Sequence, residues 1–335
     1  MRRAIATALA ICAAGAARAG PPAGIPASPA WVTISTEELR DSYDTLWAVS
    51  DVHGRLEALE QLLVASRMGT RDGQGRVRWT PGGGRQLLVV VGDCIDDGPD
   101  SVGVVLLLRR LQGQAAEEKS RVILLLGNHE VDFLAAPGKG SPELLSSADR
   151  AGFNLGRKHR GERLAETEFG DSLREMPVAA FIGTWLFAHA GYVDAEDEAG
   201  ARAYFSRIAS SWQSDGADRY APLRDPRSIV SYHRWWESRR RRSAMKANLA
   251  ALGLDGLVFG HDPGAFGAPG IIAMEAGGWL TKLDTGLKTG HSRGMLLRCD
   301  VGRIVRGTDL SMSDQGRPTC GGLTGDGALH ELPVR

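Results

Sequence analysis

Five short polar segments carry the residues of this 335-residue chain that can do chemistry, and each segment follows an apolar run. Their side chains are carboxylates, imidazoles and a carboxamide, which are ligands for borderline divalent metals. The sequence has no Cys-x-x-Cys pair, so a thiolate zinc site is not expected. In chain order the segments are SDVHG from Ser50, GDCID from Gly92, GNHE from Gly127, HAG from His189 and GH from Gly260.

The apolar runs before the first three segments predict the strands that position them. Residues 46–50, 87–91 and 122–126 are rich in aliphatic side chains, and helix-forming stretches at 56–63 and 101–111 separate them. This strand–loop–helix order predicts parallel strands joined by crossover helices. Because the carboxyl ends of parallel strands meet at one edge of a sheet, we expect the polar residues of these loops to converge.

The remaining elements have weaker patterns. Residues 192–230 are polar and give few signals, and residues 141–230 as a whole are interpreted as an irregular lid or substrate region. The other expectations are a long hairpin or loop at 69–86, helices within 141–175 and at 243–252, a hairpin or strand at 181–188, and strands at 256–259, 280–283 and 294–299.

The two ends of the chain read as separate from the main folded domain, which is expected at 41–310. Residues 1–19 have a basic start, a short apolar run and an Ala-Arg-Ala site, which predict a signal peptide and an exported protein, periplasmic or secreted. Residues 20–40 read as a Pro-rich linker, and the Gly-rich residues 311–335 as a loosely ordered tail. No other stretch is long and apolar enough for a membrane anchor.

Charge and cysteine content narrow the function classes. Lys and Arg total 40, as do Asp and Glu, so no nucleic-acid partner is expected. Cys94 is expected to be a small buried residue. Cys299 and Cys320 can pair in an oxidising compartment, but their spacing alone does not show that they do.

Taken together and in this order, the five segments resemble the signature of the calcineurin-like metallophosphoesterase superfamily, and within it the phosphoprotein phosphatases. The likeness spans residues 50–261 and extends to LDTG at 283–286, and the stretch WTPGGGRQLLVVVGD looks most like bacterial Shewanella-like protein phosphatases. The resemblance implies an α/β fold, with a two-sheet β-sandwich flanked by helices and a dinuclear metal site at the carboxyl ends of the strands.

The resemblance also implies a role for each matched residue. Two divalent ions, Mn, Fe or Zn, would bind the phosphate oxygens and activate a bridging hydroxide for direct attack. His129 would protonate the leaving oxygen as general acid, and Asp96 would orient its ring. The implied ligands are Asp51, His53 and His261 for one ion, Asn128 and His189 for the other, and Asp93 bridging both.

The chain departs from the family pattern at Asp97, which stands where an Arg would bind the substrate phosphate. The change removes a bidentate donor and adds a negative charge, which would disfavour a dianion by about 1 to 3 kcal/mol. Either another basic residue compensates, or the substrate carries less charge, or catalysis is weak. Arg234 is the candidate for a second phosphate-binding Arg, beside Asn128, although it and the run 239–242 also fit a solvated basic face.

The expected function is hydrolysis of phosphomonoesters, with a phosphorylated protein or small molecule as substrate. One alternative is a hydrolase of nucleotides, dinucleoside polyphosphates or phosphodiesters. Another, from a different class, is a binding protein that keeps the metals but has little turnover, which Asp97 favours and the intact His129 and Asp96 oppose.

Overall fold

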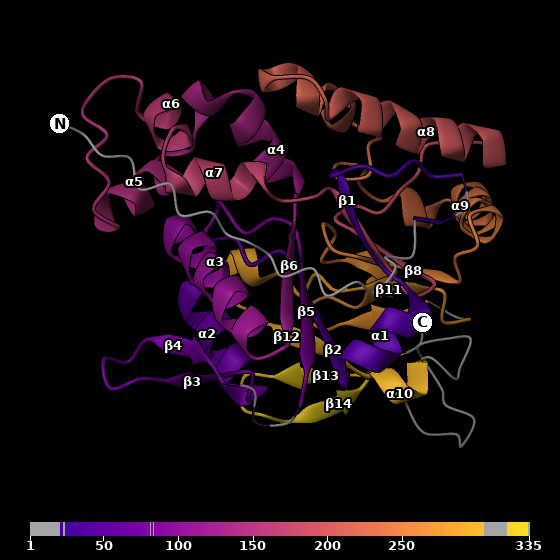
Figure 1. Ribbon diagram of the computed structural model, residues 1–335, viewed down its shortest axis with the longest axis horizontal. Coiled ribbons are helices and arrows are strands. Elements are labelled where there is room, and N and C mark those ends of the chain that lie inside the picture. Colours follow the sequence, from indigo (N-terminus) through magenta and orange to yellow (C-terminus); the bar gives the residue numbers. More distant parts are fainter. Residues whose placement is uncertain are drawn as a thin grey trace.

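Two six-stranded sheets pack face to face and are flanked by helices (Figure 1). The computed structural model describes residues 21–304 and 320–333, apart from residues 23, 81, 83 and 276. One sheet has the order β1 (Trp31–Ile34), β7 (Ala179–Ile182), β8 (Trp185–Ala188), β9 (Gly256–Phe259), β11 (Leu280–Lys282), β10 (Ala273–Met274). The other has the order β14 (Leu329–Glu331), β13 (Cys320–Thr324), β12 (Met295–Asp300), β2 (Thr45–Val49), β5 (Gln86–Val91), β6 (Arg121–Leu125). The predicted α/β sandwich is therefore confirmed.

The side chains of β5 alternate between two hydrophobic cores, as the period of two in a strand requires. Leu87 and Val89 pack in the core between the sheets, where Phe187 of β8 also lies. Leu88 and Val90 belong to the core under the helices. Because both faces of this strand are covered, its sequence is a continuous apolar run rather than an alternating one.

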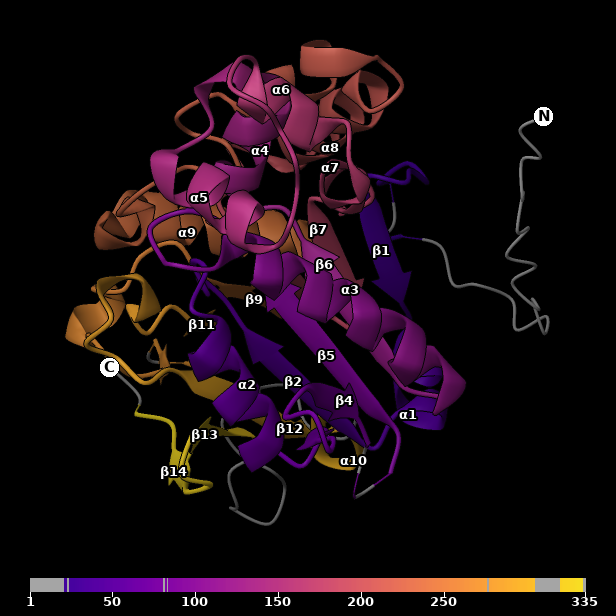
Figure 2. The ribbon, with the colours of Figure 1, turned by 90° about the vertical axis from the view of Figure 1, so that its left-hand side faces the viewer.

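Helices α2 (Leu56–Ala65) and α3 (Ser101–Glu117) lie across the outer face of β2 and β5 (Figure 2). The buried leucines of α2, Leu59, Leu62 and Leu63, fall on one side at helical spacing. Asp100 caps α3, because its side chain accepts a hydrogen bond from the backbone N–H of Gly103. Both helices begin soon after a polar loop and so help to fix its position.

The other helices gather around the upper end of the sandwich in Figure 1 or close its base. Residues 141–175 contain three helices, as predicted, with a loop at 151–159 between the first two. Helix α8 was missed, although its buried Ala201, Tyr204, Phe205 and Ile208 follow helical spacing. These helices are α1 (Thr36–Ser42), α4 (Asn128–Ala135), α5 (Pro142–Arg150), α6 (Arg160–Ala165), α7 (Glu168–Arg174), α8 (Glu198–Ser211), α9 (Arg239–Ala251) and α10 (Val301–Ile304). A hairpin of β3 (Gly69–Arg71) and β4 (Val77–Trp79) and short 3-10 turns complete the fold.

Both predicted boundaries of the catalytic domain need correction. Within the expected linker, β1 pairs in parallel with β7, and α1 follows it, so the fold begins before residue 41. Within the expected loose tail, β13 and β14 pair in antiparallel fashion in the second sheet. Apolar side chains explain both results, since Trp31, Ile34 and Leu323 are buried. The predicted signal peptide and residues 305–319 lie outside the described residues.

The cysteines resolve the question that spacing left open. Cys299 of β12 and Cys320 of β13 are partners in the strand register and form a disulfide. Cys94 is free and buried, as predicted. Among the described residues, no helix is both long enough and apolar enough to cross a membrane.

Candidate metal centre

The loops that follow the parallel strands β2 and β5 bring the first group of predicted ligands together. Nε2 of His53 lies 3.8 Å from Oδ1 of Asp51 and 3.6 Å from Oδ2 of Asp93. All three side chains are buried. Their nitrogen and oxygen atoms are close enough to surround one cation.

The second group forms around His189, which follows β8. Its Nε2 lies 3.1 Å from Oδ2 of Asp93, 3.2 Å from Oδ1 of Asn128 and 3.1 Å from Nδ1 of His261. Asp93 therefore belongs to both groups, in the position expected of a bridging ligand. His261 was assigned to the ion held by Asp51, and the structure corrects this: its ring joins Asp93 and His189, and only its backbone N–H reaches the carboxylate of Asp51.

The donors fit a pair of divalent cations. The three imidazoles direct one nitrogen into the cluster, because the other nitrogen is held by a backbone carbonyl. These bonds join His53 Nδ1 to Ile95 O at 3.1 Å, His189 Nδ1 to Val91 O at 2.9 Å, and His261 Nε2 to Ser231 O at 3.0 Å. Such outer hydrogen bonds fix the orientation of a ligand ring. Oxygen and imidazole donors without thiolates suit Mn, Fe or Zn.

Burial and neighbouring charges shift the pKa values of the two buried carboxylates, Asp51 and Asp93. Burial, opposed by His189 but reinforced by the nearby Asp93, raises the pKa of Asp51 to about 6. Burial also favours the neutral form of Asp93, but His189, together with His129 and His53, outweighs it and holds the pKa of Asp93 well below its usual value. Two carboxylates in so dry a place require positive charge beside them, which bound cations would supply.

The backbone at the strand ends is strained in the same places. Asp51, His53, Asp93 and His261 all have φ between 45° and 65°, in the left-handed region that non-glycine residues seldom adopt. Strain of this kind persists where the surrounding structure enforces it, and it is concentrated at functional sites. The polar side chains are therefore held in place at a cost in free energy.

Glu130, the last residue of the GNHE segment, supports this loop, a role that the sequence pattern does not indicate. Its buried carboxylate accepts hydrogen bonds from the backbone N–H groups of Asp93, Cys94, Ile95 and Gly127, at 2.7 to 3.2 Å. Four donors on one carboxylate tie the loop after β5 to the loop after β6. Glu130 therefore positions ligands without being one.

His129 and Asp96 lie together beside the cluster, as the predicted acid pair requires. Nδ1 of His129 lies 3.0 Å from Oδ2 of Asp96, and its Nε2 lies 3.8 Å from Oδ2 of Asp93. Burial lowers the pKa of His129, but the hydrogen bond to Asp96 and the charge of Asp93 outweigh it and raise the pKa to about 9. The hydroxyl of Ser141 donates to the other oxygen of Asp96 and fixes the carboxylate.

The side chain of Asp97 reaches the same place but is not left unpaired. Its Oδ2 lies 3.6 Å from Nδ1 of His53, 3.8 Å from Nε2 of His129 and 3.0 Å from Nζ of Lys288. The attraction between Asp97 and Lys288 outweighs the effect of burial and lowers the pKa of Asp97. The sequence offered no signal for Lys288, which lies 191 residues away along the chain.

Arg234 does not join the cluster. Its side chain is 70% exposed and forms an ion pair with Glu237 at 2.6 Å. The neighbouring His233 is closer to the centre, since its ring stacks on that of His261 with centroids 3.8 Å apart. A phosphate-binding role for Arg234 stays a prediction.

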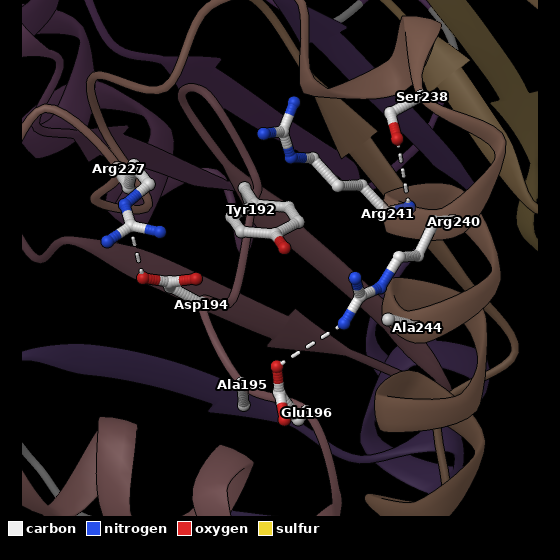
Figure 3. Close-up of a pocket in the computed structure, with 9 residues that line it drawn as sticks. All are labelled: Tyr192, Asp194, Ala195, Glu196, Arg227, Ser238, Arg240, Arg241 and Ala244. Carbon is white, nitrogen blue, oxygen red and sulfur yellow. Dashed lines mark hydrogen bonds and ion pairs between the residues drawn. The ribbon is translucent and has the colours of Figure 1, made fainter.

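A polar cavity of about 530 Å³ lies next to Tyr192, the residue after the HAG segment, and none of its lining residues is a predicted metal ligand (Figure 3). Figure 3 shows Tyr192 between arginines, two of which face carboxylates. The ring of Tyr192 contacts Tyr232, the residue before His233, and the ring of His233 stacks on that of the predicted ligand His261. Its charged lining residues are Arg227, Arg240, Arg241, Asp194 and Glu196.

Comparison with known proteins agrees with this geometry. Residues 45–265 match the family described as calcineurin-like phosphoesterase. Shewanella-like protein phosphatase 2 of Arabidopsis thaliana is 24% identical over 324 residues, which cover 80% of this chain and 78% of that protein.

Solved structures share the fold at lower identity. The cold-active protein-tyrosine phosphatase of a psychrophilic Shewanella species is 20% identical with a TM-score of 0.65, and the match covers 92% of this chain and 84% of that one. A protein serine/threonine phosphatase of Saccharomyces cerevisiae is 16% identical with a TM-score of 0.55, over 91% and 84% of the two chains. With a family match over more than half of its length and the ligands gathered in two adjoining groups, this chain belongs to the calcineurin-like phosphoesterase family and is a metal-dependent phosphoesterase.

Proposed function

We propose that this phosphoesterase hydrolyses phosphomonoesters, with phosphoproteins as its substrates and Mn²⁺ as an effective metal. The observation that carries the proposal is the bond between His129 and Asp96 beside the bridging carboxylate of Asp93. Hydrolysis of an unactivated ester needs a proton for the leaving oxygen, and His129 can deliver it from Nε2. Relatives named as protein phosphatases support the substrate class.

The chain's own residues prepare the reaction in three ways. Asp96 holds the ring of His129 and stabilises its protonated form. The buried loops around Asp93 exclude water from the ligand cluster, which strengthens charge interactions there. Asn128, at the amino end of α4, lies next to His189, where its amide can also meet a phosphoryl oxygen. When bound, the two metal ions would supply Lewis acidity and lower the pKa of a water molecule.

The cavity lined by Tyr192, Arg240 and Arg241 supports a protein substrate. Its volume of about 530 Å³ can receive residues that flank a phosphorylated side chain. Arg240 and Arg241 give it the means to hold acidic residues, since Arg241 lies over the ring of Tyr232 and has no carboxylate partner among the described residues. A small phosphate ester would not need this space.

We further propose that the protein is exported to the periplasm or the medium. The basic and apolar pattern of residues 1–19 supports export, and so does the disulfide between Cys299 and Cys320, because such bonds persist in oxidising compartments. Fractionation of cells that express the full chain tests this. Recovery of uncleaved protein with free thiols in the cytoplasm would contradict it.

A substrate panel on the mature chain tests the catalytic proposal. With Mn²⁺ added, p-nitrophenyl phosphate and phosphopeptides should be hydrolysed, and bis-p-nitrophenyl phosphate should be a poorer substrate. A diester cleaved much faster than the monoester would favour the phosphodiesterase alternative. Bound metal without turnover of any ester would favour a binding protein.

A further inference from the structure

The segment that carries Lys288 is held firmly in place although it lies far along the chain from the first three loops. Oδ1 of Asp284 accepts a hydrogen bond from the backbone N–H of Gly286 at 2.8 Å. Nη2 of Arg55 donates to the carbonyl oxygen of Lys288 at 2.6 Å. Lys288 itself lies in a short 3-10 turn, Leu287–Thr289, which directly follows Gly286. The carbonyl group of Lys288 is therefore anchored by Arg55, and Asp284 closes the turn that precedes it.

The ammonium group of Lys288 reaches the rim of the metal centre. It lies 3.0 Å from Oδ2 of Asp97, and the same oxygen faces Nδ1 of His53 and Nε2 of His129. The side chain is half exposed, with 50% of its surface accessible, so an incoming ligand can meet it. Lys288 thus stands close to both a metal ligand and the proposed acid.

We propose that Lys288 binds the phosphoryl group of the substrate, and that Asp97 positions its ammonium. This inference deepens the proposed function and rests on it. Asp97 occupies the place of the family's phosphate-binding Arg, and its carboxylate draws in a cation from another part of the chain. An ammonium has three donors, so one can stay on Asp97 while the other two meet phosphoryl oxygens.

The charge of Lys288 indicates which class of phosphate ester the site prefers. A lysine is a compact charge without the planar fork of an arginine, so it attracts a phosphate without imposing its orientation. A monoester dianion gains more from a point charge than a diester monoanion does. Lys288 should therefore favour the binding of monoesters. Its loss should reduce the difference in affinity between monoesters and diesters.

The test compares Lys288→Gln with Lys119→Gln, a control at the amino end of β6 and so at the opposite edge of the sheet. For Lys288→Gln we expect about a tenfold rise in KM for p-nitrophenyl phosphate, which corresponds to about 1.4 kcal/mol, and a similar rise in the Kd of inorganic phosphate. Titration calorimetry on the metallated protein gives that Kd without turnover. Lys288→Arg should restore most of the affinity, and the control should match the wild type.

Asp97 is tested in both backgrounds. In Lys288→Gln, Asp97 has lost its partner and repels phosphate, so adding Asp97→Asn should recover part of the lost affinity. With Lys288 present, Asp97→Asn should give no such gain, because it releases the ammonium from its position.

Three results would overturn the inference. They are an unchanged Kd for phosphate in Lys288→Gln, an equal effect of Asp97→Asn in both backgrounds, or loss of metal in Asp97→Asn, which would make Asp97 a ligand. If the wild type binds phosphate through Lys288 but hydrolyses no ester, the proposed function fails while the binding role of Lys288 stands.

Discussion

Replacing Asp96 by Asn should slow the proton-transfer step and leave the metal ligands intact. The side chain keeps its shape and its place beside Ser141, but it loses the negative charge that faces His129 at 3.0 Å. A partly buried hydrogen bond to a charged group contributes about 1.5 to 3 kcal/mol. If this stabilisation is lost in the transition state but not in the substrate complex, kcat should fall about tenfold to a hundredfold.

The assay should vary the leaving group. A phosphoserine peptide has a poor leaving oxygen that needs a proton, whereas p-nitrophenolate departs readily without one. Asp96→Asn should therefore reduce kcat much more for the peptide. The hydrogen bond that His129 donates to Asp96 raises the pKa of His129, so its loss should also move the alkaline limb of the pH–rate profile to lower pH.

Asp132→Asn is the matched control, because Asp132 is an exposed carboxylate on α4 one turn beyond His129. Asp132→Asn should leave kcat for both substrates, and the pH–rate profile, unchanged. Equal losses of kcat for the two leaving groups in Asp96→Asn, with full metal content, would refute the assignment of His129 as the acid.

Four further changes test the supports of the site. Glu130→Ala leaves four buried N–H groups without their acceptor and should lower the free energy of unfolding by more than about 3 kcal/mol, measured with denaturant; a loss under 1 kcal/mol would contradict this. Gly92→Ala should lower the free energy of unfolding by about 2 kcal/mol and weaken metal binding, because its Cβ would lie 2.7 Å from Nδ1 of His189; normal metal content would contradict this. Cys299→Ser should cost about 2 to 4 kcal/mol through loss of the disulfide, with unfolding compared against the reduced wild type, which should match it. Arg240→Ala should lower kcat/KM for acidic phosphopeptides by up to about fivefold, a small effect because exposed charges contribute little, and should leave kcat/KM for p-nitrophenyl phosphate unchanged. Equal effects on the two substrates would show that the cavity does not bind the substrate.

The sequence predicted the parts of the site that follow parallel strands. Asp51, Asp93 and Asn128 end three apolar runs in parallel register, so their convergence follows from sheet geometry. His189 and His261 required the resemblance, because they belong to the other sheet and no local pattern places that sheet against the first. The division of ligands between ions was misjudged at His261 for the same reason.

Contacts between distant segments could not be predicted. Lys288 reaches Asp97 from a 3-10 turn, and neither residue's neighbours in sequence indicate the other. The predicted domain boundaries at residues 41 and 310 were wrong because β1 and β13 are short and lie in stretches whose Pro and Gly content is typical of unstructured chain. Their burial depends on a neighbouring strand that periodicity alone does not identify.

The number of metal ions per chain, before and after the change Asp93→Ala, tests the central claim most directly. Elemental analysis of the mature protein, loaded with Mn²⁺ and freed of excess, should give two ions per chain. Asp93→Ala removes the carboxylate shared by both ligand groups and should abolish turnover and reduce the content below one ion. Two ions retained with turnover intact in Asp93→Ala, or fewer than two in the active wild type, would contradict the dinuclear centre.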